Sequence, residues 1–452
     1  MKKLLATTVL SMLAINLIIE PACAILERKI DKQTKQTTIL DTVNFDWWKK
    51  QNDEHLEKYI VSAINNNYDI KTAALKIEQA QINVMSTRAG QLPTLSIGAS
   101  PALIKMPETT KTMGSFALPV MASWELDLFG KNWDKTKSSK KLLKGVESQA
   151  AASDIAIIAA VGSVYYNIVK LDKLIEVQKD LVKDRESIYN LMKLSNDEGI
   201  ASTADMIQAE KSFVMSQNEL LDYEKARNSA LNALAILIGD SPENKKEYSR
   251  ISADELNLQF DVPSEISSDI ISSRPDYKAL EYQLEAAGLD VRVAKKEFLP
   301  TINILGMLAF VATSAASSMS FENALGLAAG SVNLPIFTGG LKKANLKLNK
   351  NKYEQLLAQY QKTNLIAIQE VNDSLYNFKS DEEKLKNNSK AYEIQKKDYG
   401  YSELKYDEGV ISKLDLLQQK EALLYMEKLL ASSKTDCYID KISLYKVTGA
   451  RI

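Results

Sequence analysis

The chain of 452 residues contains two copies of one pattern, and this repeat limits the folds that it can adopt. Asp69 and Asp276 are 207 residues apart, and so are Pro93 and Pro300. Other matches follow at offsets of 208 to 210 residues: Leu128-Phe129 with Ile336-Phe337, Glu198-Gly199 with Glu408-Gly409, Ser202 with Ser412, Asp205 with Asp415 and Gly239 with Gly449. Because the offset drifts in one direction only, the pattern is typical of a duplicated segment with small insertions.

Each copy predicts a helix, a strand hairpin and two further helices. The first repeat covers 25–239, with a helix over 53–91, a hairpin over 94–129 and helices over 131–239. The second covers 265–452, with a helix over 274–298, a hairpin over 301–337 and helices over 341–449, and 240–264 form a linker. Leu-Pro ends both leading helices, because proline disfavours helical backbone at the preceding residue. The prediction is a mainly α fold with a small β part.

The hairpins are predicted from an apolar alternation with a period of two. The alternating apolar residues are Leu95, Ile97 and Ala99 in one segment, Trp124, Leu126 and Leu128 in the next, and Val332, Leu334 and Ile336 in the second copy. This pattern indicates four strands, each with one apolar and one polar face. A small soluble sheet packed on the helices and a membrane-facing sheet both fit it, since strand signals of membrane barrels are weak.

The helices that follow the hairpins are too long for a globular core. They cover about 131–195 and 341–407, so each is on the order of 100 Å long. Asp197-Glu198-Gly199 and Asp407-Glu408-Gly409 turn the chain, because glycine supplies a left-handed helix cap. The returning helices carry seven-residue series: Met206, Phe213, Leu220 and Leu234 in copy one, and Leu416, Leu423, Leu430, Cys437 and Leu444 in copy two. This spacing predicts antiparallel coiled coils.

The N-terminus is typical of a secretory signal peptide over residues 1–24. Lys2 and Lys3 precede an apolar run, and small residues, Ala22 and Ala24, surround a cleavage point. The alternatives are an uncleaved membrane anchor, or lipidation of Cys23 as the first mature residue. No later segment has ~18 uninterrupted apolar residues, so we expect no transmembrane helix after it.

The composition excludes several kinds of chemistry. One His and two Cys cannot supply a His-based metal site, a four-cysteine zinc site or a His-centred catalytic triad. The chain has 57 Lys and Arg residues and 58 Asp and Glu residues, so it lacks the excess of positive charge that is typical of nucleic-acid-binding proteins. The sequence contains no phosphate-binding loop and no nucleophile elbow. We therefore expect no enzyme activity, cofactor or metal, and an exported hydrolase has no support beyond scattered carboxylates.

Four strands cannot close a barrel, and an open sheet edge cannot lie in lipid because its backbone groups would lack hydrogen-bond partners. If the strands lie in a membrane, several chains must contribute their strands to one closed barrel. Three chains would give a closed barrel of twelve strands, from which the long helices project as a second, helical barrel. The pattern therefore predicts a conduit, but it leaves the number of chains open.

Several motifs resemble those of one family. They are Phe45-Asp46-Trp47-Trp48, Trp124-Glu125-Leu126-Asp127-Leu128-Phe129-Gly130, Arg274-Pro275-Asp276 continuing to Phe298-Leu299-Pro300, Leu334-Pro335-Ile336-Phe337-Thr338-Gly339-Gly340, and Tyr406-Asp407-Glu408-Gly409 leading to Leu414-Asp415-Leu416-Leu417. With these motifs the chain resembles the outer-membrane efflux proteins of the TolC type, most closely the NodT/OprM-like branch. The resemblance covers nearly the whole mature chain.

The resemblance implies a homotrimer in the bacterial outer membrane, with a twelve-stranded β-barrel and a long periplasmic α-barrel. Such proteins are exit ducts of tripartite pumps and work with a periplasmic adaptor (membrane fusion) protein and an inner-membrane transporter, here of the RND type. The expected cargo is small molecules such as drugs or toxic compounds. A duct for type I protein secretion and a soluble periplasmic coiled-coil scaffold are the alternatives.

The resemblance also assigns roles to residues at the periplasmic tip. The pairs Gly199-Ile200 and Gly409-Val410 match the turns where adaptor hairpins dock. Tyr406 and Asp205 match a hydrogen bond between neighbouring coils that closes the aperture, and Asp415 matches a carboxylate that rings the constriction and selects for cations.

Two residues differ from the family pattern and weaken this assignment of roles. A purely structural interpretation of the tip residues also remains. Gln418 stands where a second ring carboxylate can occur, and Ile411 stands where an arginine can add a closing link. Asp205 and Asp415 also fit the S-x-x-D pattern of a helix cap, which needs no role in a pore. Tyr406 could equally be a packing residue of the coil.

Overall fold

The computed structural model describes residues 53–105, 112–244, 248–257, 269–312 and 324–450, together with 262 and 266. The predicted signal peptide and Cys23 lie outside the described residues, as do parts of the linker. The helices are α2 (Glu54–Asn66), α3 (Tyr68–Ala89), α4 (Lys131–Asp197), α5 (Thr203–Leu237), α6 (Asp269–Ser273), α7 (Pro275–Lys296), α8 (Leu341–Asp407) and α9 (Lys413–Val447). The strands are β1 (Thr94–Ile97), β2 (Ser100–Lys105), β3 (Thr112–Leu126), β4 (Thr301–Ala312) and β5 (Ala324–Asn333), and two 3-10 turns, η3 (Pro242–Asn244) and η4 (Ala253–Glu255), lie in the linker.

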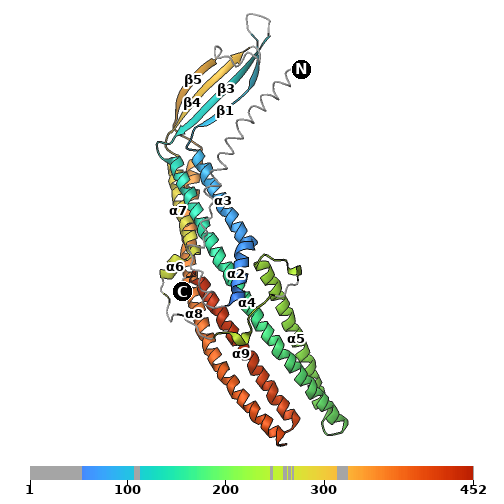
Figure 1. Cartoon of the computed structure of the whole chain (residues 1–452). Coiled ribbons are helices and arrows are strands. Elements are labelled where there is room, and N and C mark those ends of the chain that lie inside the picture. Colours follow the sequence, from blue (N-terminus) through green and yellow to red (C-terminus); the bar gives the residue numbers. More distant parts are fainter. Residues whose placement is uncertain are drawn as a thin grey trace.

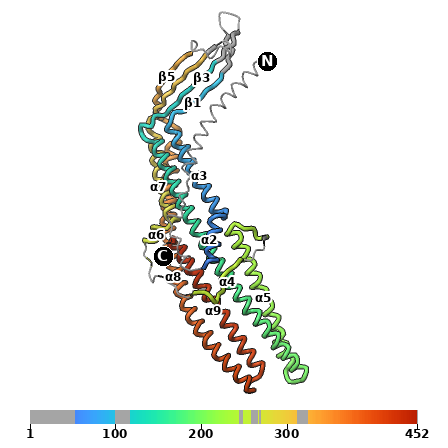
Figure 2. Tube along the Cα trace, viewed as in Figure 1, coloured from blue at the N-terminus to red at the C-terminus, as the bar shows by residue number. Residues whose placement is uncertain are grey.

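The molecule is a long rod with the sheet at one end and two helical hairpins at the other (Figure 1). The duplication is present in the structure, because corresponding helices have equal lengths. Helices α3 and α7 have 22 residues each, α4 and α8 have 67, and α5 and α9 have 35. The two long helices run from the sheet to the far tips without a break (Figure 2).

The helix expected over 53–91 is in fact two helices, which meet at Asn67. This residue has extended backbone (φ −66°, ψ 131°), and its side-chain oxygen accepts hydrogen bonds from the N–H groups of Asp69 and Ile70. The side-chain amide also donates to the carbonyl of Leu237, at 2.8 Å. Continuous helical periodicity hid this break, because an asparagine that caps a helix can also be read as a residue inside one.

The strands are shorter at their helical ends than expected. Strand β3 ends at Leu126 and β5 ends at Asn333, so Leu128, Leu334 and Ile336 lie beyond the sheet. Strand β4 begins at Thr301, directly after Pro300, and its first residues pair with the last residues of β3 and β5. The residues that follow Leu126 and Asn333 therefore lie past the start of β4, and no described strand is available to pair with them.

The strands form one antiparallel sheet in the order β1-β3-β4-β5, and β2 also pairs with β3. Ile97 pairs with Val120 and Ser100 with Ala117, so β1 and β2 continue the same register. The interruption lies opposite Pro119, which has no N–H to donate to the ladder. The five segments therefore occupy four strand positions. Among the described strands, the outer edges of β1/β2 and β5 have no partner.

The helices form a single curved layer in the same order as the strands. Near the sheet, α3 packs on α4, α4 on α7, and α7 on α8; towards the tips, α5 packs on α4, α4 on α9, and α9 on α8. Helix α8 makes no extensive contact with α3 or α5 in the described part of the chain. The layer therefore ends in two edges, one formed by α3 and α5 and the other by α8.

The largest apolar core lies halfway along the rod, where the two copies meet. It surrounds the middle of α4 and includes Leu56, Ile60, Ile158, Val161, Tyr165, Tyr166, Ile168, Leu234 and Ile442. The Tyr166 and Tyr438 rings stack with their centroids 4.6 Å apart. The linker is attached here, because the Ile251 N–H donates to the Tyr165 hydroxyl and the Tyr59 hydroxyl donates to the Ser249 carbonyl.

Helix α4 contains a stretch that is long and apolar enough to cross a membrane, but 56% of that stretch is buried inside the protein. Ala150, Ile155, Ile158 and Val161 are all buried. The Ala-rich run of α4 therefore serves close helix packing, as its interruption by Ser153 and Asp154 suggests.

Both copies close the middle of the rod with the same kind of contact. In copy two, Arg274 donates to the Val447 carbonyl at 3.0 Å and forms ion pairs with Asp276 and Glu370. In copy one the Asn67 amide bonds the corresponding Leu237 carbonyl. The Arg-Pro-Asp motif therefore joins the start of α7 to α8 and to the end of α9.

We expect Gly239→Ala to destabilise the protein more than Gly199→Ala. Both glycines have left-handed backbone (φ +75° and +73°), where a side chain costs about 1–2 kcal/mol. A Cβ at Gly239 would in addition lie 2.5 Å from the Asn66 carbonyl oxygen, whereas nothing lies within 4 Å at Gly199. Denaturant unfolding in detergent, followed by circular dichroism, measures the difference. Equal losses of unfolding free energy would contradict the expected clash.

Candidate functional site

The tips of the two hairpins are the candidate site, and both have the same turn. At the end of α4, the Ile200 N–H donates to the Ser195 carbonyl (2.7 Å) and the Gly199 N–H donates to the Asn196 carbonyl (3.0 Å). At the end of α8, Val410 and Gly409 make the equivalent bonds to Lys405 and Tyr406, at 2.8 and 2.9 Å. These are Schellman caps, which use glycine in the left-handed conformation.

Each turn presents one aliphatic side chain to solvent. Ile200 is 82% exposed and Val410 is 67% exposed. Beyond its left-handed φ of +73°, neither Gly199 nor Gly409 is constrained, because a Cβ would meet nothing within 4 Å. The tips therefore expose apolar groups on a backbone that is held rigidly by the caps.

Asp205 and Asp415 take part in the helix caps of α5 and α9, in which Ser202 and Ser412 are the N-cap residues. Ser202 caps α5 by accepting from the Asp205 N–H (3.1 Å), and its hydroxyl donates to the Asp205 carboxylate (2.7 Å). At α9 the capping box is complete, because the Ser412 N–H also donates to the Asp415 carboxylate, at 3.0 Å. Bonds from the Ser412 hydroxyl and N–H lower the pKa of Asp415. This exposed carboxylate therefore stays ionised in more acidic solution than an ordinary aspartate.

The structure does not join Tyr406 to Asp205. The carboxylate of Asp205 bonds Ser202 within its own turn, and the Tyr406 ring lies under the Lys413 ammonium, whose Nζ is 5.0 Å from the ring centroid. Gln418, the residue that departs from the expected carboxylate, is exposed on α9.

A polar network that the sequence analysis missed connects the two hairpins above their tips. The ammonium of Lys428 on α9 donates to Gln178 of α4 (2.8 Å) and to Glu219 of α5 (2.6 Å). Burial opposes ionisation of Glu219, but the bonds from Lys428 and Tyr223 lower its pKa. Lys428 is 9% exposed. In the sequence it resembles any surface lysine of a coiled coil, so no local signal predicts its burial.

Two further ion pairs join the same helices nearer the tip. Lys420 on α9 lies 2.8 Å from Asp184 on α4, and Glu421 lies 3.0 Å from Arg185. The α4–α5 and α8–α9 hairpins are thus connected along α4 and α9, while the described turns of α4 beyond Arg185 form no ion pair with α9.

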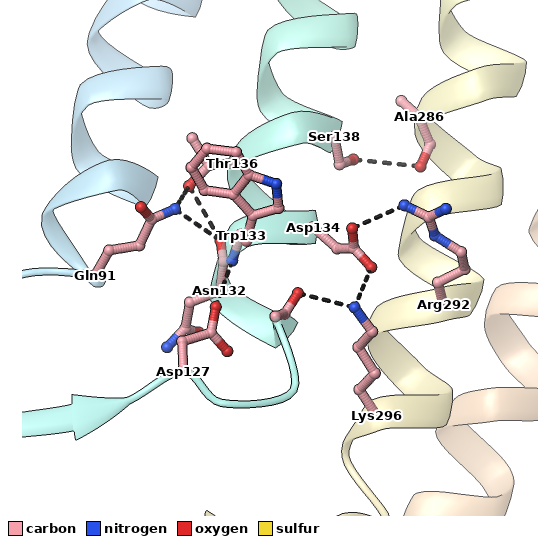
Figure 3. Close-up of polar contacts among 11 residues, drawn as sticks. Gln91, Asp127, Asn132, Trp133, Asp134, Thr136, Ser138, Ala286, Arg292 and Lys296 are labelled. Atoms are coloured by element: carbon pink, nitrogen blue, oxygen red, sulfur yellow. Dashed lines mark hydrogen bonds and ion pairs between the residues drawn. The ribbon is translucent and has the colours of Figure 1, made fainter.

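The joint between the sheet and the helices is also polar and rigid (Figure 3). Asp134, near the start of α4, accepts from Arg292 (2.7 Å) and Lys296 (2.6 Å) of α7. Burial opposes ionisation of Asp134, but these two cations lower its pKa. Gln91, after α3, donates to the Thr136 hydroxyl at 2.6 Å. Three helices are therefore held at fixed positions directly below the strands.

The described residues contain no group of three or more His, Cys, Asp or Glu side chains that could hold a metal ion. Cys437 is a buried residue of the α9 packing seam. The described carboxylates noted above are engaged in caps and ion pairs between helices.

Comparisons with known proteins agree with this architecture. The sequence model described as "Outer membrane efflux protein" matches residues 59–240 and 266–450. The probable efflux pump outer membrane protein TtgC of Pseudomonas putida is 26% identical over 411 residues, which cover 89% of this chain and 84% of that protein. Toxin and drug export protein A of Aggregatibacter actinomycetemcomitans is 24% identical, covering 90% and 92% of the two chains.

Among solved structures, the Campylobacter jejuni CmeC outer membrane channel superposes with a TM-score of 0.83 at 25% identity, covering 90% of this chain and 88% of that one. The similarity includes the sheet, the rod and the hairpins, because the match spans nearly all of both chains. The chain therefore belongs to the outer membrane efflux protein family.

Proposed function

We propose that this protein is the outer-membrane exit duct of a tripartite efflux system and passively conducts small molecules through a gated trimeric tunnel. The observation that carries the proposal is that the unpaired edges of the sheet lie on the same sides of the molecule as the unpaired edges of the helical layer. The sheet ends at β1/β2 and β5, and the helical layer ends at α3/α5 and α8. Strand β1 follows α3 and β5 precedes α8, so each edge of the sheet continues into the edge of the helical layer.

Such edges fit a ring of identical chains. The β5–α8 side of one protomer would pair with the β1–α3 side of the next. Such head-to-tail contacts generate a closed ring when the rotation from one protomer to the next divides a full turn evenly. Pairing satisfies the backbone groups that lipid cannot satisfy. Large apolar side chains also remain exposed on both helical edges: Leu75, Ile82, Ile207 and Leu221 on one side, and Leu365, Tyr376 and Ile394 on α8.

Three protomers would place twelve strands in the membrane and leave the helices as a periplasmic tunnel about 100 Å long. The trimer follows the resemblance described above, and barrels of 8 to 26 strands occur in outer membranes. Energy for transport would come from an inner-membrane transporter of the RND type, reached through a periplasmic adaptor. The relatives named for efflux and for toxin and drug export favour small molecules as cargo.

We propose that the gate closes when an α8–α9 tip is held against an α4–α5 tip by a bond between Tyr406 and Asp205. The tips extend beyond the last ion pair between the hairpins, so they can tilt while α4 and α9 stay joined. Adaptor contact at the tips would then shift a closed-to-open equilibrium.

The double variant Tyr406→Phe, Asp205→Ala should increase single-channel conductance severalfold in planar bilayers, because it removes both partners of the closing bond. The parent protein should show a small, stable conductance under the same conditions. Tyr425→Phe, an exposed tyrosine of α9 away from the tip, is the matched control. Conductance equal to that of the parent would refute the gate assignment, and the absence of channels from both proteins would refute the duct.

We also propose that three copies of Asp415 ring the tunnel entrance and favour cations. Because the pKa of Asp415 is lowered, its charge persists as the pH falls and is lost only when the pH drops below this lowered value. Reversal potentials across a salt gradient should therefore show cation preference even near pH ~4, where an ordinary aspartate is half protonated.

Asp415→Asn should reduce this preference at every pH. Ser412→Ala removes the hydroxyl donor, so the preference should be lost at a higher pH than in the parent. A preference that Asp415→Asn leaves unchanged would exclude the ring.

The exposed pair Ile200 and Val410 is proposed to dock the adaptor. Changing both to Asp should abolish efflux of ethidium from cells, because a charge would have to be desolvated in an apolar contact. The exposure of both side chains predicts an unchanged midpoint of thermal unfolding. Ile200→Val with Val410→Ile is the conservative control and should retain efflux; equal efflux by the Asp variant would contradict docking at these residues.

A further inference from the structure

The strand registers sort the described residues of the sheet onto two faces. Residues of neighbouring strands that pair lie on the same face, and residues alternate between faces along each strand. Trp124 pairs with Ile304, Val120 with Leu308, and Ile302 with Val332. Among the residues whose side chains the structure describes, this face consists of Leu95, Ile97, Leu118, Val120, Ala122, Trp124, Leu126, Ile302, Ile304, Gly306, Leu308, Phe310, Ala324, Gly326, Ala328, Gly330 and Val332.

We call this set the apolar face. This set contains no charged side chain, no amide and no hydroxyl; its one polar group is the Trp124 indole N–H, which donates to the Gln91 carbonyl at 3.0 Å. By register, the end of the same face furthest from the helices has Lys105 opposite Thr112. A band without hydrogen-bonding side chains that extends over several rows of a sheet is what lipid requires. In a closed barrel, the opposite face must then line the lumen.

The opposite face is most polar next to the helices. Its first row pairs Glu125 with Asn303 and Asn303 with Ser331, and the next row is mixed, with Thr94 and Ser123 followed by Leu305 and Ala329. These residues agree with the polar face expected from the sequence.

Further from the helices the same face becomes mostly apolar, which the alternation did not predict. Met121 pairs with Met307 and Met307 with Leu327, while Ser96 of β1 lies on the other side of Met121. In the following row Pro119 pairs with Ala309 and Ala309 with Leu325. We call Met121, Met307, Leu325 and Leu327 the apolar collar. Leu325 is 64% exposed and Leu327 is 52% exposed, so the protein's own chain does not cover them.

Close packing across the lumen does not explain the collar. Side chains just fill a barrel of eight strands, and a barrel of twelve is wider. The collar would therefore face water or a passing solute. A water-filled lumen gains nothing from apolar side chains, since exposing them to water is unfavourable.

We propose that the apolar collar is a contact site in the tunnel wall for apolar and amphipathic small molecules. This inference rests on the proposed function, because it places the collar inside a closed barrel. Methionine is flexible and polarisable and adapts to ligands of different shapes. Two methionines and two leucines from each protomer would form one weak apolar site per chain, separated from the next by Ser96 of β1. Weak binding is what conduction requires.

The first test asks which face is open to water. Met121→Cys and Met307→Cys should react with a charged methanethiosulfonate reagent in membranes, and modification should reduce single-channel conductance at least about twofold. Leu308→Cys, next to Met307 on the apolar face, should not react. The parent controls for the native cysteines, of which Cys437 is buried. Labelling of Leu308→Cys but not of the two methionine positions would overturn the proposal.

The second test measures the chemistry of the collar. Tetrabutylammonium should block the parent channel more strongly than tetramethylammonium. In Met121→Ser, Met307→Ser, block by tetrabutylammonium should weaken roughly tenfold, while block by tetramethylammonium should not change. Ser331→Ala, on the same face in the polar row, should leave both affinities as in the parent.

These outcomes separate the two proposals. Equal affinities in the parent and the double serine variant would overturn the collar and leave the duct intact. If no variant conducts, the duct fails, and the labelling pattern alone decides which face meets water.

Discussion

The unpaired backbone along the two edges of the sheet is the constraint on which the rest of this structure depends. An N–H or C=O group without a partner in lipid costs several kcal/mol, so four strands that end in open edges cannot be a finished membrane structure. The helical layer also has two edges, because α8 on one side and α3 with α5 on the other make no extensive contact with each other in the described part of the chain. Sheet and helices are therefore completed by the same neighbour.

A single layer that must form a ring also needs internal stiffness. Its largest apolar cluster lies at one level, around Tyr165 and Tyr166, and polar contacts join the helices at several levels away from it. Asp134 fixes the helices below the sheet, Arg274 joins helix ends at the middle, and Lys428 joins the hairpins. The tips beyond these contacts carry only caps, and this leaves them free to be the moving part.

The sequence predicted the duplicated plan because its signals are local. Glycine at positive φ ended α4 and α8 within two residues of the expected turns, and the serine caps lie where S-x-x-D placed them. The break at Asn67 was missed because an asparagine fits both a helix interior and a helix cap, and the bond that holds its amide, to the Leu237 carbonyl, is 170 residues away. Lys428 was missed for the same reason, since its burial depends on Gln178 and Glu219 of other helices.

By itself, the sequence determined which segments are helix and strand, where the long helices turn, and that one plan is used twice. Helix periodicity, glycine caps and proline boundaries act over a few residues and can be read without a partner. Only the tertiary structure decided how the strands pair. The register sets which side chains share a face, and it places Met307 between Met121 and Leu327 on the face opposite the apolar face. The tertiary structure also left Tyr406 and Asp205 apart, because a contact between tips depends on the arrangement of whole hairpins and not on the residues of either turn.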